Sequence, residues 1–152
     1  MLLIGMSFLL VTMACSLVQR ISQGVQISQA ERVWQETAIE DYQIKVLVVQ
    51  SIWHAQSHTI TVESGQVVES SASCTPAPME FKDCQVRDFD AADFTVPGLF
   101  AKARDQTELG NNRWSVITFN ASYGYPNKIA YDHPEIMDED WAWRVVDFQV
   151  MK

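Results

Sequence analysis

Basic residues are scarce in this sequence. It has 11 Lys and Arg against 19 Asp and Glu in 152 residues, which gives a formal net charge of −8. Binding to nucleic acid needs a basic face that releases counterions from phosphates, and docking on an anionic membrane surface needs basic clusters. The charge balance argues against both, and we expect no nucleic-acid partner.

Motifs that carry chemistry are also missing. The sequence contains no glycine-rich phosphate loop, no nucleophile elbow and no readable grouping of Ser, His and Asp. We therefore expect a protein that needs no cofactor and is not an enzyme. Its length and its 11% aromatic content suit a single globular domain with its own core.

Charge is absent from the first 18 residues, and the opening run MLLIGMSFLLV is almost wholly apolar. One interpretation is a signal peptide over residues 1–14. The following Cys15 would then carry a lipid, because the segment VTMAC resembles the bacterial lipobox. The other interpretation is an uncleaved anchor over residues 1–18, since 18 helical residues span about 27 Å. Both predict a protein of the bacterial cell envelope that is tethered to the membrane and faces the periplasm or the exterior.

The two remaining cysteines, Cys74 and Cys84, flank nine residues that include two prolines. An even pair in an exported chain predicts one disulfide bond. A metal site is the weaker alternative, because two thiols would need two more ligands and no CxxC or histidine pair flanks either cysteine. In the chain-entropy model, closing so short a loop stabilises the fold by about 2–3 kcal/mol.

Hydrophobic periodicity predicts an α+β fold with the order helix, three strands, helix, three strands. Residues 15–27 are interpreted as a linker and residues 28–152 as a single domain, whose first helix covers residues 28–39 from a capping box at Ser28. Thr95 caps the second helix. The strands are expected at residues 42–48, 59–63, 66–70, 113–119, 127–131 and 141–150. They predict one antiparallel sheet of about six strands with both helices packed on one face.

Hard metal ligands are densest near the C-terminus, at Asp132, His133, Asp138, Glu139 and Asp140. Carboxylates with one imidazole can bind Ca²⁺ or a catalytic metal, although the spacing matches no EF-hand loop. We favour a solvated loop here. A metal-binding protein or a metal-assisted hydrolase that uses this cluster is the alternative function.

Two histidines and two tryptophans have spacings that invite a site. His54 and His58 are four residues apart, but they lie between two strand patterns without the glutamate of a metalloprotease motif, so we interpret them as ordinary loop histidines. Trp141 and Trp143 project to the same side of a strand. They pack on the core or contact a partner, and both interpretations stay open.

Several short motifs occur in a recognisable order, including VESGQV at residues 62–67 and VPGLF at residues 96–100. The most specific one comprises Tyr123, Gly124, Tyr125, Pro126 and Ile129. Over residues 34–149 the chain resembles domain-of-unknown-function family 6174, a family of small exported bacterial proteins that are often lipoproteins. The resemblance implies fold and compartment, and it implies no activity.

The signature motif itself has a structural interpretation. Gly124 permits a positive φ and Pro126 fixes the entry into the next strand. Taken together, the sequence predicts an exported, membrane-tethered envelope protein. We expect a non-enzymatic binding or interaction module whose partner is an unknown envelope protein or a cell-wall component.

Overall fold

The computed structural model of the chain describes residues 23–50, 54–76, 84–108, 114–132, 135 and 140–151. The expected signal peptide at residues 1–14, the anchor at residues 1–18 and the lipid site at Cys15 lie outside these residues. Among the helices that the structure describes, none is long and apolar enough to cross a membrane.

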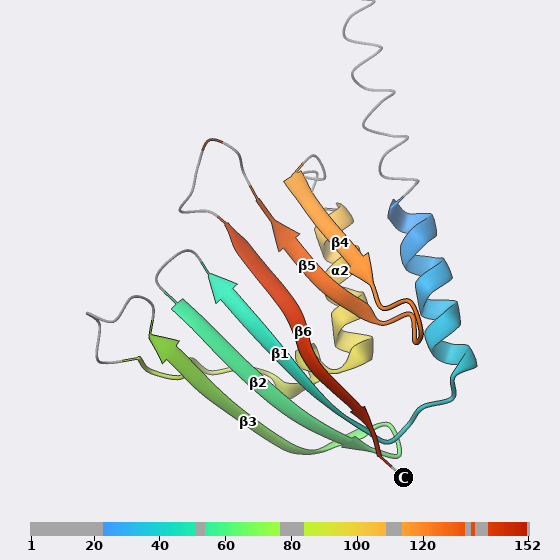
Figure 1. Cartoon of the computed structure of the whole chain (residues 1–152), viewed down its shortest axis with the longest axis horizontal. Helices are drawn as coiled ribbons and strands as arrows, with labels where there is room; N and C mark the ends of the chain where they lie inside the picture. Colours follow the sequence, from blue (N-terminus) through green and yellow to red (C-terminus); the bar gives the residue numbers. More distant parts are fainter. Residues whose placement is uncertain are drawn as a thin grey trace, which may run out of the picture.

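Six strands form one antiparallel sheet in the order β3-β2-β1-β6-β5-β4 (Figure 1). Two meanders, β1–β2–β3 and β4–β5–β6, meet at the central β1–β6 pair. The expected α+β class with one six-stranded antiparallel sheet is confirmed. The strands are β1 (Tyr42–Gln50), β2 (His54–Glu63), β3 (Gln66–Pro76), β4 (Ser115–Phe119), β5 (Pro126–Tyr131) and β6 (Trp141–Val150).

Both helices pack on the same face of this sheet, which we call the inner face. Trp34, from the N-terminal helix at residues 23–36, lies edge-on to Tyr42 of β1 with ring centres 5.6 Å apart. The backbone N–H of Val96, the first residue of α2 (Val96–Glu108), donates to the hydroxyl of the same tyrosine. An ion pair of 2.8 Å between Glu31 and Arg104 joins the two helices.

The N-terminal helix begins earlier than the sequence predicts. Residues 23–27 are already helical, so the interpretation of residues 15–27 as a linker is wrong for this part, and Ser28 is not the N-cap. Its hydroxyl donates to the carbonyl of Gly24 one turn before, which is how a serine inside a helix satisfies its side chain. The helix ends at residue 36 rather than 39, because Ala38 adopts a positive φ of 49°.

The cap of the second helix is confirmed. The Thr95 hydroxyl accepts from the backbone N–H of Gly98 at 3.2 Å, and Pro97 lies in the first turn, where its missing N–H breaks no hydrogen bond. A short 3-10 helix, η1 (Ala91–Phe94), precedes α2 and has Asp90 as its cap.

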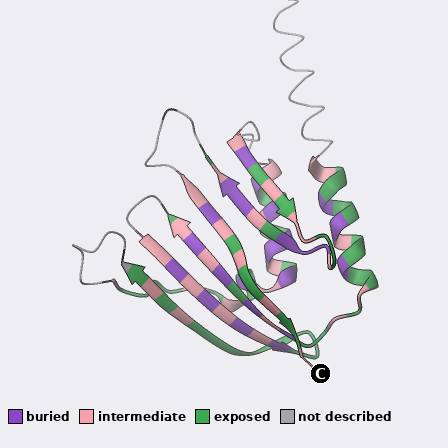
Figure 2. Ribbon diagram, viewed as in Figure 1, coloured by how far each residue is buried: buried purple, intermediate pink, exposed green. Residues whose placement is uncertain are grey.

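The first meander is longer than predicted. β2 begins at His54 instead of residue 59, and β3 continues to Pro76 instead of ending at residue 70. Buried and more exposed residues alternate along β1 and β2, as expected for strands with one face on the core (Figure 2). The turn between β2 and β3 has Ser64 and Gly65 at positive φ, the pattern of a tight hairpin.

Candidate functional site

The inner face of the β1–β2 pair changes from apolar to polar along its length. Its cross-strand pairs run in the order Tyr42–Val62, Ile44–Ile60, Val46–His58, Val48–Gln56 and Gln50–His54. The apolar end lies near the N-terminal helix and the start of α2. The polar end is crossed by residues 84–90, which we call the strap (Figure 1).

At the apolar end, an aromatic cluster fills the space under the N-terminal helix. The ring centre of Trp34 lies 5.6 to 6.5 Å from the ring centres of Tyr42, Tyr125 and Phe148. The two phenol groups are paired: Tyr42 accepts from Val96, and Tyr125 accepts from the side-chain amide of Asn120. Burial raises the pKa of both tyrosines, so they remain neutral. The cluster consists of Trp34, Tyr42, Tyr125 and Phe148.

The signature motif of residues 123–129 contributes Tyr125 to this cluster and contacts the N-terminal helix. Gly124 has a φ of 79°, and a Cβ placed on it would lie 2.4 Å from the carbonyl oxygen of Ala30 in the N-terminal helix. Tyr125 and Ile129 are buried on the inner face. The motif is therefore the contact between the β4–β5 turn and the N-terminal helix.

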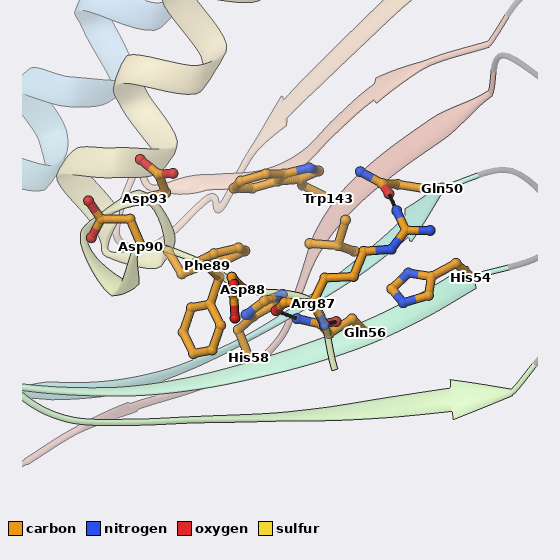
Figure 3. Close-up of a pocket in the computed structure, with 12 residues that line it drawn as sticks. Gln50, His54, Gln56, His58, Arg87, Asp88, Phe89, Asp90, Asp93 and Trp143 are labelled. Carbon is orange, nitrogen blue, oxygen red and sulfur yellow. Dashed lines mark hydrogen bonds between the residues drawn. The ribbon is translucent and has the colours of Figure 1, made fainter. Parts of the chain in front are cut away.

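At the polar end there is a pocket of about 220 Å³ (Figure 3). It opens between the strap, η1 and the inner faces of β1, β2 and β6. Its lining comprises Val48, Gln50, His54, Gln56, His58, Arg87, Asp88, Phe89, Asp90, Asp93, Phe94 and Trp143.

One wall of the pocket is a stack of three rings. The imidazole of His58 lies 3.7 Å from the ring of Phe94, and Phe94 lies 4.7 Å from the indole of Trp143, in nearly parallel planes. Phe89 meets His58 edge-on at 4.6 Å. Stacked and edge-on contacts of this kind stabilise the arrangement of the three rings and Phe89.

His58 is the most unusual polar group of the pocket. It is 3% exposed, and its Nδ1 atom has no hydrogen-bond partner among the described residues. Burial, with a smaller contribution from His54, lowers the pKa of His58 to about 4. The ring is therefore neutral at pH 7. An unpaired buried nitrogen costs about 1–3 kcal/mol, which a ligand or a water molecule in the pocket would recover.

The strap is held by a buried amide. Gln56, 3% exposed, accepts from the N–H of Arg87 at 2.9 Å and donates to its carbonyl at 3.1 Å, so one side chain satisfies both backbone groups. The Arg87 guanidinium donates to the side-chain oxygen of Gln50 at the end of β1. These contacts place the guanidinium at the mouth of the pocket (Figure 3).

A disulfide bond between Cys74 and Cys84 fastens the start of the strap to β3, as the sequence predicts. His54 of β2 lies beside it, with its Nε2 atom 3.6 Å from the sulfur of Cys74. The Nδ1 atom of His54 is buried and has no hydrogen-bond partner in the described part of the chain.

The interpretation of His54 and His58 as loop histidines is wrong, because both lie on β2 with their side chains in the pocket. The period-two alternation of His54, Gln56 and His58 with Ile60 continues the strand pattern toward the N-terminus. It was missed because polar residues occupy the inward positions. Arg87 carried no signal of its own in the sequence.

Trp141 and Trp143 lie half-buried on the inner face of β6. The ammonium of Lys102 in α2 is 5.4 and 5.0 Å from their ring centres, at cation–π distance. Both rings thus pack inside the protein, and Trp143 also lines the pocket. A contact of these rings with a partner stays a prediction.

The structure describes two of the five members of the acidic cluster near the C-terminus, Asp132 and Asp140. His133, Asp138 and Glu139 lie outside the described residues, and Asp132 is exposed. A metal site formed by Asp132, His133, Asp138, Glu139 and Asp140 therefore stays a prediction.

A comparison with protein-family models matches residues 26–150 to a family described as "Family of unknown function (DUF6174)". The chain belongs to this family. The resemblance inferred from the motifs is thereby confirmed, and the match covers both the aromatic cluster and the pocket. Among curated proteins and among solved structures, no match to the chain is found.

Proposed function

We propose that this protein is an exported, membrane-tethered envelope protein that binds a small anionic ligand, without catalysis, in the pocket at the polar end of its sheet. The export and tethering part rests on the apolar residues 1–18 and on Cys15 after a lipobox-like segment. The disulfide between Cys74 and Cys84 supports it, since such bonds persist in oxidising compartments.

The guanidinium of Arg87 is the observation that carries the ligand assignment. Among the described residues, no carboxylate lies within ion-pair distance of this group, although the chain has an excess of acidic side chains. Gln50 holds one of its nitrogens, which leaves the remaining donors of the planar fork for an anion. Gln56 fixes the backbone of Arg87 and Gln50 holds its guanidinium, which orients this exposed side chain before an anion binds.

The charges around the pocket limit the kind of anion. Asp88, Asp90 and Asp93 also line it, so a ligand with several negative charges would be repelled. A ligand with a single negative charge can pair that charge with Arg87 and meets the least repulsion from these carboxylates. We therefore favour a small monocarboxylate over a polyphosphate.

The size and the walls of the pocket limit the rest of the ligand. About 220 Å³ is below the roughly 300–1,000 Å³ of pockets for drug-sized molecules. Val48, Phe94 and Trp143 make part of the lining apolar. A small acid with an apolar body fits this combination.

A non-enzymatic role agrees with the state of His58. A general base works best when its pKa is near the operating pH. With a pKa of about 4, His58 accepts protons poorly at pH 7. Its unpaired nitrogen is better suited to accept or donate one hydrogen bond to a bound ligand.

The binding test uses the full chain in detergent and a panel of small monocarboxylates with their matched amides, such as benzoate and benzamide. We expect the acids to bind up to about fivefold more tightly than the amides, because an ion pair with an exposed guanidinium contributes about 0.2–1 kcal/mol. Arg87→Gln should remove this preference. Arg104→Gln, a matched change at the ion pair with Glu31, should keep it. Equal binding of acids and amides, or no binding of either, would overturn the proposal.

The tethering test is the intact mass of the full-length protein purified from bacterial membranes. We expect a chain that starts at Cys15 and carries added acyl groups. A cleaved chain without lipid would refute the tether, and an uncleaved chain would replace the lipid with the anchor at residues 1–18.

A further inference from the structure

Three side chains that bind soft metals meet at the edge of the pocket. They come from the start of β2, from β3 and from the start of the strap. One ligand atom from each can be chosen so that all three lie within 4.8 Å of one another. The residues are His54, Cys74 and Cys84.

The strand register explains why they meet. In the β2–β3 pair, His54 lies opposite Pro76 and Gln56 lies opposite Cys74. His54 and Cys74 are therefore diagonal neighbours on the inner face of the sheet. Cys84 arrives from the strap, and its Cα lies 5.7 Å from that of Cys74.

The distances agree with a zinc site. Zinc binds imidazole nitrogen at about 2.0–2.1 Å and thiolate sulfur at about 2.3 Å in a tetrahedral arrangement, which separates the two ligand atoms by about 3.6 Å. The Nε2 atom of His54 and the sulfur of Cys74 are 3.6 Å apart. The two sulfurs, joined here in a disulfide, would have to move apart.

We propose that His54, Cys74 and Cys84 form a zinc site when the disulfide is reduced. An external dithiol reduces the bond by thiol–disulfide exchange, so the protein gains two electrons and two protons while the dithiol becomes a disulfide. Zn²⁺ then binds both sulfurs as thiolates and displaces their two protons. Two Cys and one His leave the fourth position of the zinc to water or to a pocket ligand.

The state of His54 supports its role as the third ligand. Besides the contact with Cys74, its ring has no hydrogen bond in the described part of the chain. No described group therefore competes with a metal for its lone pair. Because His54 also lines the pocket, zinc bound there would lie at the pocket edge.

Two alternative states of the same side chains would then hold the strap. The disulfide fastens Cys84 to β3 directly, and zinc would fasten it through the metal. In both states the strap stays close enough for Gln56 to hold Arg87. Reduction without metal would remove the link from Cys84 to β3 and leave the strap held by the hydrogen bonds of Arg87 with Gln56 and Gln50.

The experiment titrates the full chain in detergent with Zn²⁺, before and after reduction by a phosphine that does not itself supply thiol ligands. We expect the reduced protein to bind one zinc per chain and the oxidised protein to bind none at this site. Cobalt(II) in place of zinc should give the intense sulfur-to-metal absorption and the visible bands of a tetrahedral thiolate site. Circular dichroism of each variant verifies that it is folded.

His54→Ala and His133→Ala are a matched pair of variants. We expect His54→Ala to weaken zinc binding at least about tenfold, since loss of a second-shell partner alone already costs about 10–100-fold. His133→Ala, which alters the acidic cluster near the C-terminus, should bind zinc as the unaltered chain does. Failure of the reduced protein to bind zinc, or loss of binding in His133→Ala but not in His54→Ala, overturns the proposal. Neither result bears on the carboxylate site at Arg87.

Discussion

The aromatic cluster and the pocket lie on the same face of the same central strands, but they differ in how their polar atoms are used. In the cluster, the hydroxyls of Tyr42 and Tyr125 both have protein partners, and a helix covers the rings. In the pocket, His54 and His58 each have a buried nitrogen that no described residue pairs. At the cluster end both buried hydroxyls are hydrogen-bonded within the protein. At the pocket end two buried histidine nitrogens have no partner among the described residues.

This difference assigns separate tasks to the two ends. A buried polar atom without a protein partner can bond to water or to a ligand where a pocket lies beside it, as it does for these two histidines. We therefore expect substitutions in the cluster to reduce the free energy of unfolding. Substitutions in the pocket should change ligand binding and the pH dependence instead.

The largest effect should come from Trp34→Ala. Trp34 is 9% exposed and touches all three other rings of the cluster, so its removal leaves a cavity that costs about 3–5 kcal/mol. Trp143→Ala, at a half-buried ring of the pocket wall, should cost only about 1–2 kcal/mol. Urea denaturation of both variants measures the contrast. Equal losses would show that the two ends contribute equally to the core.

The next effect concerns two glycines with similar backbone conformations. Gly124→Ala combines a positive φ with a Cβ that meets the Ala30 carbonyl at 2.4 Å, so we expect a loss of about 2–3 kcal/mol. Gly65→Ala has a φ of 72° and no atom within 4 Å of the new Cβ, and it should cost about 1 kcal/mol. Thermal denaturation at one pH compares them. If Gly65→Ala loses as much stability as Gly124→Ala, the close approach of the N-terminal helix to residue 124 does not contribute to the loss.

The elements near the aromatic cluster were the easiest to predict from the sequence. On β1, Tyr42, Ile44, Val46 and Val48 alternate with more polar residues, and the strand forms with this register. Thr95 with Pro97 fixes the start of α2. Here local pattern and tertiary burial agree, because the inward positions are apolar.

The pocket was missed for the opposite reason. Its inward positions on β2 are His54, Gln56 and His58, which a hydrophobic pattern assigns to a loop. Their burial depends on the strap and on the rings of Phe89 and Phe94, which are far away in the sequence. The early start of the N-terminal helix was missed because Gln23, Gly24 and Gln26 give its first turn the composition of a polar linker. Long-range contacts decide the burial of the pocket residues.

A smaller effect is expected from removing one hydrogen-bonded hydroxyl of the cluster, that of Tyr42. Tyr42→Phe keeps the ring and removes the acceptor of the Val96 N–H, which then remains buried without a partner. We expect a loss of about 1–2 kcal/mol in the free energy of unfolding. Urea denaturation at pH 7 measures it. A neutral result would mean that another acceptor reaches the first turn of α2.

The smallest effect at pH 7 should be that of His58→Phe, which makes the corresponding change at the other end of the sheet. The substitution removes an unpaired nitrogen, the new ring can stack on Phe94 as the imidazole does, and the adjacent pocket offers room for its larger size. We expect a change of less than about 1 kcal/mol in stability at pH 7, because no existing hydrogen bond of Nδ1 is lost.

Substitutions at the two ends of the sheet should differ most clearly in their effect on stability when the pH is lowered. The pKa of His58 is about 4 in the folded protein and near 6.5 in the unfolded chain. Between these values the unfolded chain binds the extra proton, so the free energy of unfolding falls as the pH decreases from about 6.5 to about 4. His58→Phe should lose this part of the pH dependence and become more stable than the unaltered protein near pH 4.5, whereas Tyr42→Phe should keep it. Urea denaturation of the three proteins from pH 7 to pH 4.5 measures the slopes, and parallel curves would show that His58 is not held neutral by its burial.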